Sequence, residues 1–246
     1  MKKLSIKAIS ALIAIFLFTT VVRAQEDYVM FLSLNLDPAP GKTAKVIEGL
    51  KAHNASFHAE GDNKAYIWNI VTGPRSGQIS WAQGPIKYSK LDEGLTDDHN
   101  ADWEANVAAH CRSVSDVRMF RRNEGATYNP ANETVGEKVL ARIFYGVSDQ
   151  AALLEGMSKI GEVFKAKKYN FARRVYTSEF RTKDGERLFL IYPFSSWTEL
   201  ENRKGLPPNF TADYDSVHGE GTWAKFGESL QSASEGWYDE VRVMIK

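Results

Sequence analysis

His53 and Asn54 are the polar side chains of this sequence that are best placed to do chemistry. Together with Val46, Leu50 and Phe57 they fall on one stripe of an amphipathic helix, and that stripe faces a core. A buried imidazole or amide must be hydrogen-bonded, because leaving one unsatisfied costs ~1–3 kcal/mol. The pair therefore either lines a small polar ligand cavity or bonds to a neighbouring strand or to ordered water.

A second group of candidate residues stands later in the same half of the chain. Trp103, Val107 and His110 are spaced as i, i+4 and i+7, which places them on one helical face, and Cys111 follows. Imidazole is the commonest general base, so His53 and His110 are the candidate catalytic residues. The alternative for each is a core histidine that neighbouring groups satisfy.

The acidic run at residues 97–102, Asp-Asp-His-Asn-Ala-Asp, holds three carboxylates and an imidazole and could bind a divalent metal. It also stands just before a helix, where Asp and Asn accept hydrogen bonds from free N–H groups and oppose the dipole. No HExxH or CxxC pattern is present. We predict helix capping here, and no metal and no cofactor for the chain. Residues 219–224 match GxGxxA but follow no clear strand, so we predict no nucleotide site.

The scaffold for these residues is repeated in the sequence. With a shift of about 107 residues, Val46-Ile47-Glu48-Gly49-Leu50 aligns with Leu153-Leu154-Glu155-Gly156-Met157. Each half predicts the order β-α-β-β-α-β. The predicted strands are residues 28–36, 65–72, 78–83 and 116–119, then 139–147, 172–179, 187–192 and 240–243, and the second helices start near Trp103 and Trp223.

This order is typical of the split-βαβ, ferredoxin-like arrangement, in which two helices cover one face of a four-stranded sheet. We predict an α+β fold with two tandem ferredoxin-like repeats, residues 25–124 and 137–246, packed sheet to sheet as a pseudo-dimeric α/β barrel. The two open faces then bury each other, which explains a first strand that is apolar on both faces. Residues 125–136 are the predicted linker, and extra residues around 205–209 predict a lid or loop.

The element order, the duplication and three local segments resemble the dimeric α/β-barrel superfamily. The segments are Lys51-Ala52-His53-Asn54, Gly73 after the second strand, and residues 88–91 after the third. The superfamily includes the antibiotic-biosynthesis monooxygenase-like proteins and the tandem chlorite dismutases. The resemblance implies a ligand between the sheet and the helices, near His53 and His110, with Tyr66, Trp68 or Trp81 from the strands.

The resemblance to the chlorite dismutases also raises the question of haem, whose axial histidine in that group belongs to the second repeat. The one histidine at residues 137–246 is His218, in a loop-like stretch at residues 217–220. An axial ligand needs a rigidly presented imidazole, so haem is the less favoured alternative.

Residues 1–24 resemble a secretory signal peptide. Lys2, Lys3 and Lys7 precede an apolar run, and Val22-Arg23-Ala24 fits a signal-peptidase site, so we expect a periplasmic or secreted protein that starts at residue 25. The alternative is a retained N-terminal anchor. Cleavage would remove four basic residues from a balance of 31 basic and 31 acidic, and an acidic protein of this kind is a poor nucleic-acid binder. With one cysteine, no intramolecular disulfide can form.

Two functions follow from these observations. In the first, the protein binds a small organic ligand with His53, Asn54, Tyr66, Trp68, Trp81, Trp103 and His110. If it is an enzyme, the resemblance implies cofactor-independent oxidation of an aromatic compound, with His53 or His110 as the base. In the second, it is a non-catalytic structural or partner-binding protein whose halves complete each other's core.

Overall fold

The computed structural model describes residues 28–128, 136–202 and 206–246, so the predicted signal peptide lies outside the described residues. The first half contains, in order, β1 (Met30–Pro38), α2 (Thr43–Phe57), η1 (Gly61–Asn63), β2 (Ala65–Ile70), β3 (Ile79–Ile86), α3 (Tyr88–Leu91), α4 (Asp97–Asn106), η2 (Ala108–His110), β4 (Cys111–Val114) and β5 (Arg118–Arg122). The second half contains β6 (Lys138–Tyr145), α5 (Gln150–Lys167), β7 (Arg174–Ser178), β8 (Leu188–Phe194), α6 (Trp197–Asn202), α7 (Phe210–His218), α8 (Thr222–Ala233) and β9 (Gly236–Ile245).

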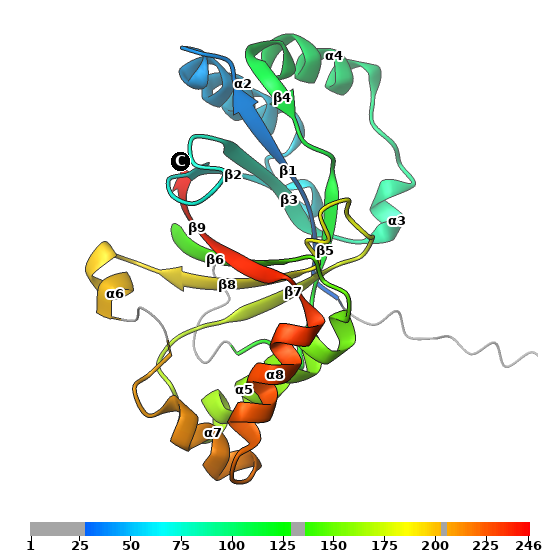
Figure 1. Ribbon diagram of the computed structural model, residues 1–246. Helices are drawn as coiled ribbons and strands as arrows, with labels where there is room; N and C mark the ends of the chain where they lie inside the picture. The colour runs from blue at the N-terminus through cyan, green and yellow to red at the C-terminus, as the bar shows by residue number, and fades with distance from the viewer. Residues whose placement is uncertain (1–27, 129–135, 203–205) are drawn as a thin grey trace, which may run out of the picture.

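The nine strands of the described residues form one sheet, and eight of them close into a barrel (Figure 1). Around the barrel the strands run β1-β3-β2-β9-β6-β8-β7-β5, and β5 pairs again with β1. The halves join edge to edge through antiparallel pairs of β2 with β9 and β5 with β7. The short β4 pairs with the C-terminal end of β1. Each half thus supplies one wall of a shared barrel.

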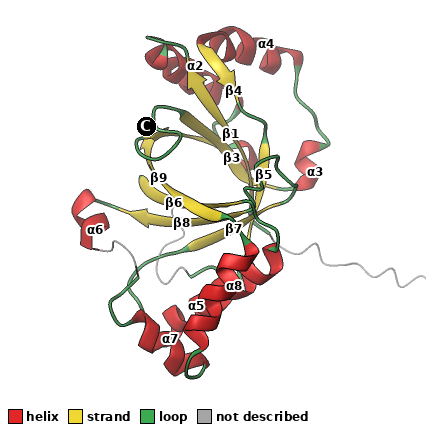
Figure 2. Ribbon diagram, viewed as in Figure 1, coloured by secondary structure: helices red, strands yellow, loops and turns green. Residues whose placement is uncertain are grey.

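Helices cover the outside of this barrel at two places (Figure 2). In the first half, α2 and α4 pack over the sheet, and their core contains Leu36, Val46, Leu50 and Trp81. In the second half, the core under α5, α7 and α8 is larger and more aromatic. A third cluster around Phe189 lies among the inward-facing strand residues. This arrangement explains why strands are apolar on both faces: the part of the sheet in each half has helices on one side and the barrel interior on the other.

The crossing of α2 and α4 depends on a glycine. A Cβ atom at Gly49 would lie 1.9 Å from the backbone oxygen of Asn106, so only glycine lets the two helices approach this closely. Gly156, its partner under the shift of about 107 residues, has the same role in α5, where a Cβ atom would lie 2.4 Å from the ring of Phe226. The spacing between α2 and α4 positions His53, which follows Gly49 by one turn.

Replacing Gly49 with alanine is therefore expected to lower the free energy of unfolding by about 1–3 kcal/mol, because the helices must separate or shift. Gly227→Ala is the matched control: Gly227 lies in α8 with open space around its Cα, and alanine there should stabilise the helix slightly. Urea denaturation of both variants checks the prediction. Equal changes in the two variants would contradict it.

One sequence expectation differs from the structure. The second helix of the first half begins at Asp97, well before Trp103, because the Thr96 hydroxyl caps it by accepting from the His99 N–H at 3.2 Å. Of the extra residues in the second half, 206–209 form a bend and a turn, and α7 follows them and buries Phe210 and Tyr214. Ala126, at the start of the predicted linker, is fully buried. No helix among the described residues has the length and apolar composition to cross a bilayer.

Candidate functional site

The sheet of the first half divides the predicted site residues between two places. In the β2–β3 ladder, Tyr66 pairs with Ala82, and Ile67 pairs with Trp81, so alternate residues face opposite sides. Tyr66 and Trp68 line a cavity inside the barrel, whereas Trp81 lies under the helices in the core of the first half. The single space expected between sheet and helices is therefore two sites on opposite faces of the sheet.

The inner site is a cavity of about 330 Å³ within the barrel. Both halves contribute to its wall, which is mainly aromatic and aliphatic with several guanidinium groups. Its aromatic and arginine residues are Phe31, Tyr66, Trp68, Phe120, Tyr176 and Phe189, with Arg75, Arg118, Arg122, Arg174 and Arg242. No Asp or Glu is among the described residues that line it. Flat rings and cations on one wall favour a ligand that is both planar and anionic.

The buried carboxylate of Glu240 holds two of these arginines in place. Glu240 is fully buried on β9 and accepts hydrogen bonds from Arg75 Nε at 2.5 Å and from Arg242 Nη2 at 3.0 Å. Arg242 also donates to the Ser80 hydroxyl at 3.2 Å. Since Arg75 and Ser80 belong to the first half and Glu240 to the second, this network connects the two halves across the β2–β9 seam.

A second carboxylate, Glu186, completes the network. It accepts hydrogen bonds from Arg118 and from the Tyr238 hydroxyl, and it lies 3.5 Å from Arg75 Nη1. Burial raises the pKa of Tyr238 far above its ordinary value, and the bond to Glu186 acts in the same direction, so the phenol stays protonated. Arg75 Nη2 is buried and has no hydrogen-bond partner among the described residues. This guanidinium donor of a cavity-lining arginine is therefore left unpaired by the network.

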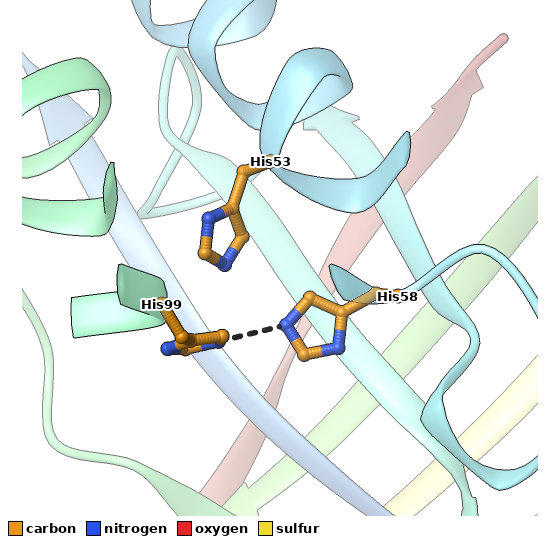
Figure 3. A group of neighbouring side chains, drawn as sticks. All are labelled: His53, His58 and His99. Atoms are coloured by element: carbon orange, nitrogen blue, oxygen red, sulfur yellow. Dashed lines mark hydrogen bonds between the residues drawn. The ribbon is translucent and has the colours of Figure 1, made fainter. Parts of the chain in front are cut away.

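The outer site is a cluster of three histidines between α2, α4 and β3. His53, on α2, is fully buried, and its Nδ1 donates to Asp102 of α4 at 2.7 Å. His58, just after α2, donates from Nδ1 to the Asn63 carbonyl at 3.0 Å. Its Nε2 lies 3.0 Å from Nε2 of His99, on the first turn of α4 (Figure 3). The three rings therefore face one another across a small gap.

Burial favours the neutral form of His53 and His58. It lowers the pKa of His58 to about 4, with a contribution from the neighbouring His53. Burial also lowers the pKa of His53, although the hydrogen bond to Asp102 opposes the shift. Phe57, Trp81 and Trp103 surround the cluster with rings whose centroids lie 5.0–5.2 Å from an imidazole. The neutral imidazoles of His53 and His58, with aromatic rings around them, are suited to donating lone pairs.

The other predicted residues have structural surroundings. Asn54 bonds to the neighbouring strands, which was the alternative to lining a ligand cavity: it donates to the Ala65 carbonyl at 3.3 Å and accepts from Trp81 Nε1 at 2.9 Å. His110 lies in the short turn η2, and the three-histidine cluster does not include it. Neither His53 nor His110 lines the barrel cavity.

Sequence reasoning missed His58, and for the run that contains His99 and Asp102 it preferred helix capping to a metal site. The signals were present: His58 follows His53 by five residues, and His99 and Asp102 belong to the acidic run. Asp97 and Asp98 lie in the first turn of α4, where their charges oppose the dipole, but the capping side chain is Thr96, and Asp102 one turn later bonds to His53.

The residues of the cavity do not fit a haem. Axial ligation needs an imidazole aimed at the iron, and no histidine is among the described residues that line the cavity. His218 is the last residue of α7 and not part of a loop, and its Nε2 donates to the Lys159 carbonyl at 3.0 Å. It lies among the outer helices, so it cannot serve the barrel interior.

Comparisons with known proteins identify the fold. No family model matches the chain, and no curated protein matches its sequence. Among solved structures, an anthrone oxidase-like protein shares 16% identity at a TM-score of 0.57, covering 91% of this chain and 93% of that one. A candidate monooxygenase from Fusobacterium nucleatum shares 10% identity at a TM-score of 0.53, covering 89% of this chain and 93% of that one. Another candidate monooxygenase, from Lactobacillus acidophilus, shares 10% identity at a TM-score of 0.51, covering 89% of this chain and 100% of that one. The chain has the dimeric α/β-barrel fold.

Proposed function

We propose that this dimeric α/β barrel is an exported protein that binds a small aromatic anion in its interior. The observation that carries the proposal is the cavity, whose wall combines six aromatic rings with five arginines. A volume of about 330 Å³ stands at the lower end of the ~300–1,000 Å³ typical of ligand sites, so a one- or two-ring compound would fit. The unpaired Nη2 of Arg75 would donate to the anionic group.

Two matched ligands test this proposal. Naphthalene-2-carboxylate and its uncharged amide have nearly the same shape, and only the first carries the charge that Arg75 would recognise. By isothermal titration the carboxylate should bind more tightly, and Arg75→Met should weaken it tenfold or more while leaving the amide nearly unchanged. Arg112→Met is the control, because Arg112 is 64% exposed and pairs with Asp37 on the surface.

If neither probe binds the wild-type protein, the rival function gains support, in which the halves merely complete each other's core. If both probes bind equally and Arg75→Met changes nothing, the cavity is a ligand site but not an anion site. Intact mass spectra of protein purified from the periplasm would also test export, since we propose cleavage after residue 24 and a chain that starts at residue 25.

The two halves are, in this proposal, tandem ferredoxin-like repeats. Two observations support it. The strands of the first half run β5-β1-β3-β2 and those of the second run β9-β6-β8-β7, so each half places its last, first, third and second strand in the same order. Gly49 and Gly156 also occupy equivalent places in the two helix pairs.

Oxidation of the bound compound is a second candidate activity. It is favoured by the names of the three fold neighbours, two candidate monooxygenases and an anthrone oxidase-like protein. The cavity places Tyr176 beside any ligand. Because His53 and His110 lie elsewhere, neither would be the base. Oxygen uptake by the protein with an electron-rich hydroxynaphthoate tests the activity, and uptake no faster than that of the compound alone would exclude it for that compound.

A further inference from the structure

The histidine cluster on the outer face of the first half has the features of a metal site. One nitrogen from each of His53, His58 and His99 lies within 4.8 Å of the other two. The ring centroids are 4.6–5.2 Å apart, and Figure 3 shows the rings converging from α2, from the turn after α2 and from α4. Three imidazoles brought together from three separate segments are unusual for a core, which normally buries apolar side chains.

The hydrogen bonds fix which nitrogen each ring can offer. His53 Nδ1 and His58 Nδ1 carry protons, because each donates to an oxygen, of Asp102 and of Asn63 respectively. Their Nε2 atoms therefore hold lone pairs. A carboxylate or carbonyl that accepts from the far side of a histidine is the arrangement that orients histidine ligands of metals. His53 and His58 are thus held in the ligand tautomer.

The protein itself leaves two ring nitrogens of this cluster unsatisfied. His53 Nε2 and His99 Nδ1 are both buried without a hydrogen-bond partner among the described residues. An unpaired buried polar atom costs roughly 1–3 kcal/mol, so a purely structural cluster would be expected to pair His53 Nε2, and an ion bound through the Nε2 atoms would do so. Figure 3 shows a nitrogen of His53 directed at the gap between His58 and His99, where a shared partner would lie.

We propose that His53, His58 and His99 bind one Zn²⁺ ion through their Nε2 atoms. Zinc takes imidazole nitrogens at ~2.0–2.1 Å in a tetrahedron, which spaces the nitrogens roughly 3.3 Å apart. The Nε2 atoms of His58 and His99 are already 3.0 Å apart, and small side-chain rotations bring in His53. His99 then carries its proton on Nδ1. An all-nitrogen set selects zinc and its transition-metal neighbours over Mg²⁺ and Ca²⁺, which prefer oxygen.

This site is independent of the barrel cavity. Trp81 contacts the cluster on the outer face of β3, while Ala82 lines the cavity on the inner face. Asp102 acts through His53 and is a positioning residue. The fourth position of the tetrahedron would be taken by a water or by a small ligand, as in three-histidine zinc sites.

Zinc titration of the purified, chelator-treated protein tests the proposal, with a chromophoric zinc indicator as the competitor. We expect one Zn²⁺ per chain, no competition by Mg²⁺, and at least a hundredfold weaker binding in His99→Gln and in His58→Gln. His110→Gln is the matched control and should bind as the wild type does. Asp102→Asn should weaken binding 10–100-fold with the fold retained by circular dichroism.

Cobalt gives a second readout that does not depend on stability. Co²⁺ in a four-coordinate nitrogen site absorbs visible light strongly, so the wild type and His110→Gln should become coloured and His99→Gln should not. His99 is only half-buried, so this variant should fold even if His58→Gln does not. Absence of saturable one-to-one zinc binding, as for a cluster held by a bridging water, would overturn the proposal. So would unchanged zinc affinity in a folded His99→Gln.

Discussion

Glu240→Ala is expected to lower the free energy of unfolding by about 3–5 kcal/mol, the largest effect of any single substitution considered for this barrel. The carboxylate is fully buried and accepts from both Arg75 and Arg242. Removing it takes the fully buried counter-charge from two largely buried guanidinium groups and opens a cavity at the β2–β9 seam. Urea denaturation followed by circular dichroism measures the change.

Two further variants show how much of this loss comes from the buried charge of Glu240. Glu240→Gln keeps the shape and one acceptor oxygen, so it should fall between the wild type and the alanine variant. Glu137→Ala removes an exposed carboxylate that pairs with Lys246 where β6 and β9 meet, and it should leave the denaturation midpoint unchanged. A loss in Glu240→Ala no larger than that in Glu137→Ala would show that the network does not stabilise the barrel.

The order of elements was predictable from the sequence because it depends on short-range patterns. Helical periodicity located α2 and α5, and the repeated Glu-Gly pair in them marks the close helix contacts that Gly49 and Gly156 make. The strand positions agree with the structure within a few residues. Such signals are local, since each depends on residues within one or two turns or one strand.

The direction of the strand side chains was not predictable. When both faces of a strand are apolar, alternation gives no sign of which face is inside, and a shift of one residue exchanges them. Tyr66 and Trp68 were therefore grouped with Trp81, although Tyr66 pairs with Ala82 on the inner face and Trp81 pairs with Ile67 on the outer face. The network of Glu186 and Glu240 was missed because its members meet only when the barrel closes.

The histidine cluster was not predicted because its members meet at the end of a helix. On a continuous helix His58 would lie about 140° away from His53, at 100° per residue. The helix ends at Phe57, however, and His58 leaves the helical conformation with φ −135° and ψ 31°. Its ring turns back toward His53, and His99 arrives from α4. Helix ends are the least predictable part of an element.

The metal-free protein is expected to lose about 2.5 kcal/mol of stability through His58 alone between about pH 7.5 and pH 4.5. The pKa of His58 is about 4 in the folded chain, against the ordinary value of 6.5 that it regains on unfolding. Between pH 6.5 and pH 4, His58 therefore binds a proton in the unfolded chain but not in the folded chain. The stability contributed by the neutral ring is complete above pH 6.5 and falls as the pH approaches 4.

Urea denaturation at the two pH values, with a chelator present throughout, measures this loss. His58→Gln should be less sensitive to acid than the wild type, because glutamine does not titrate. His110→Gln should keep the wild-type sensitivity. His53, whose pKa burial also lowers, contributes in the same direction and remains in every variant, so the comparison isolates His58. If His58→Gln loses as much stability on acidification as the wild type, the pKa of His58 is not lowered in the folded protein, which would contradict the prediction.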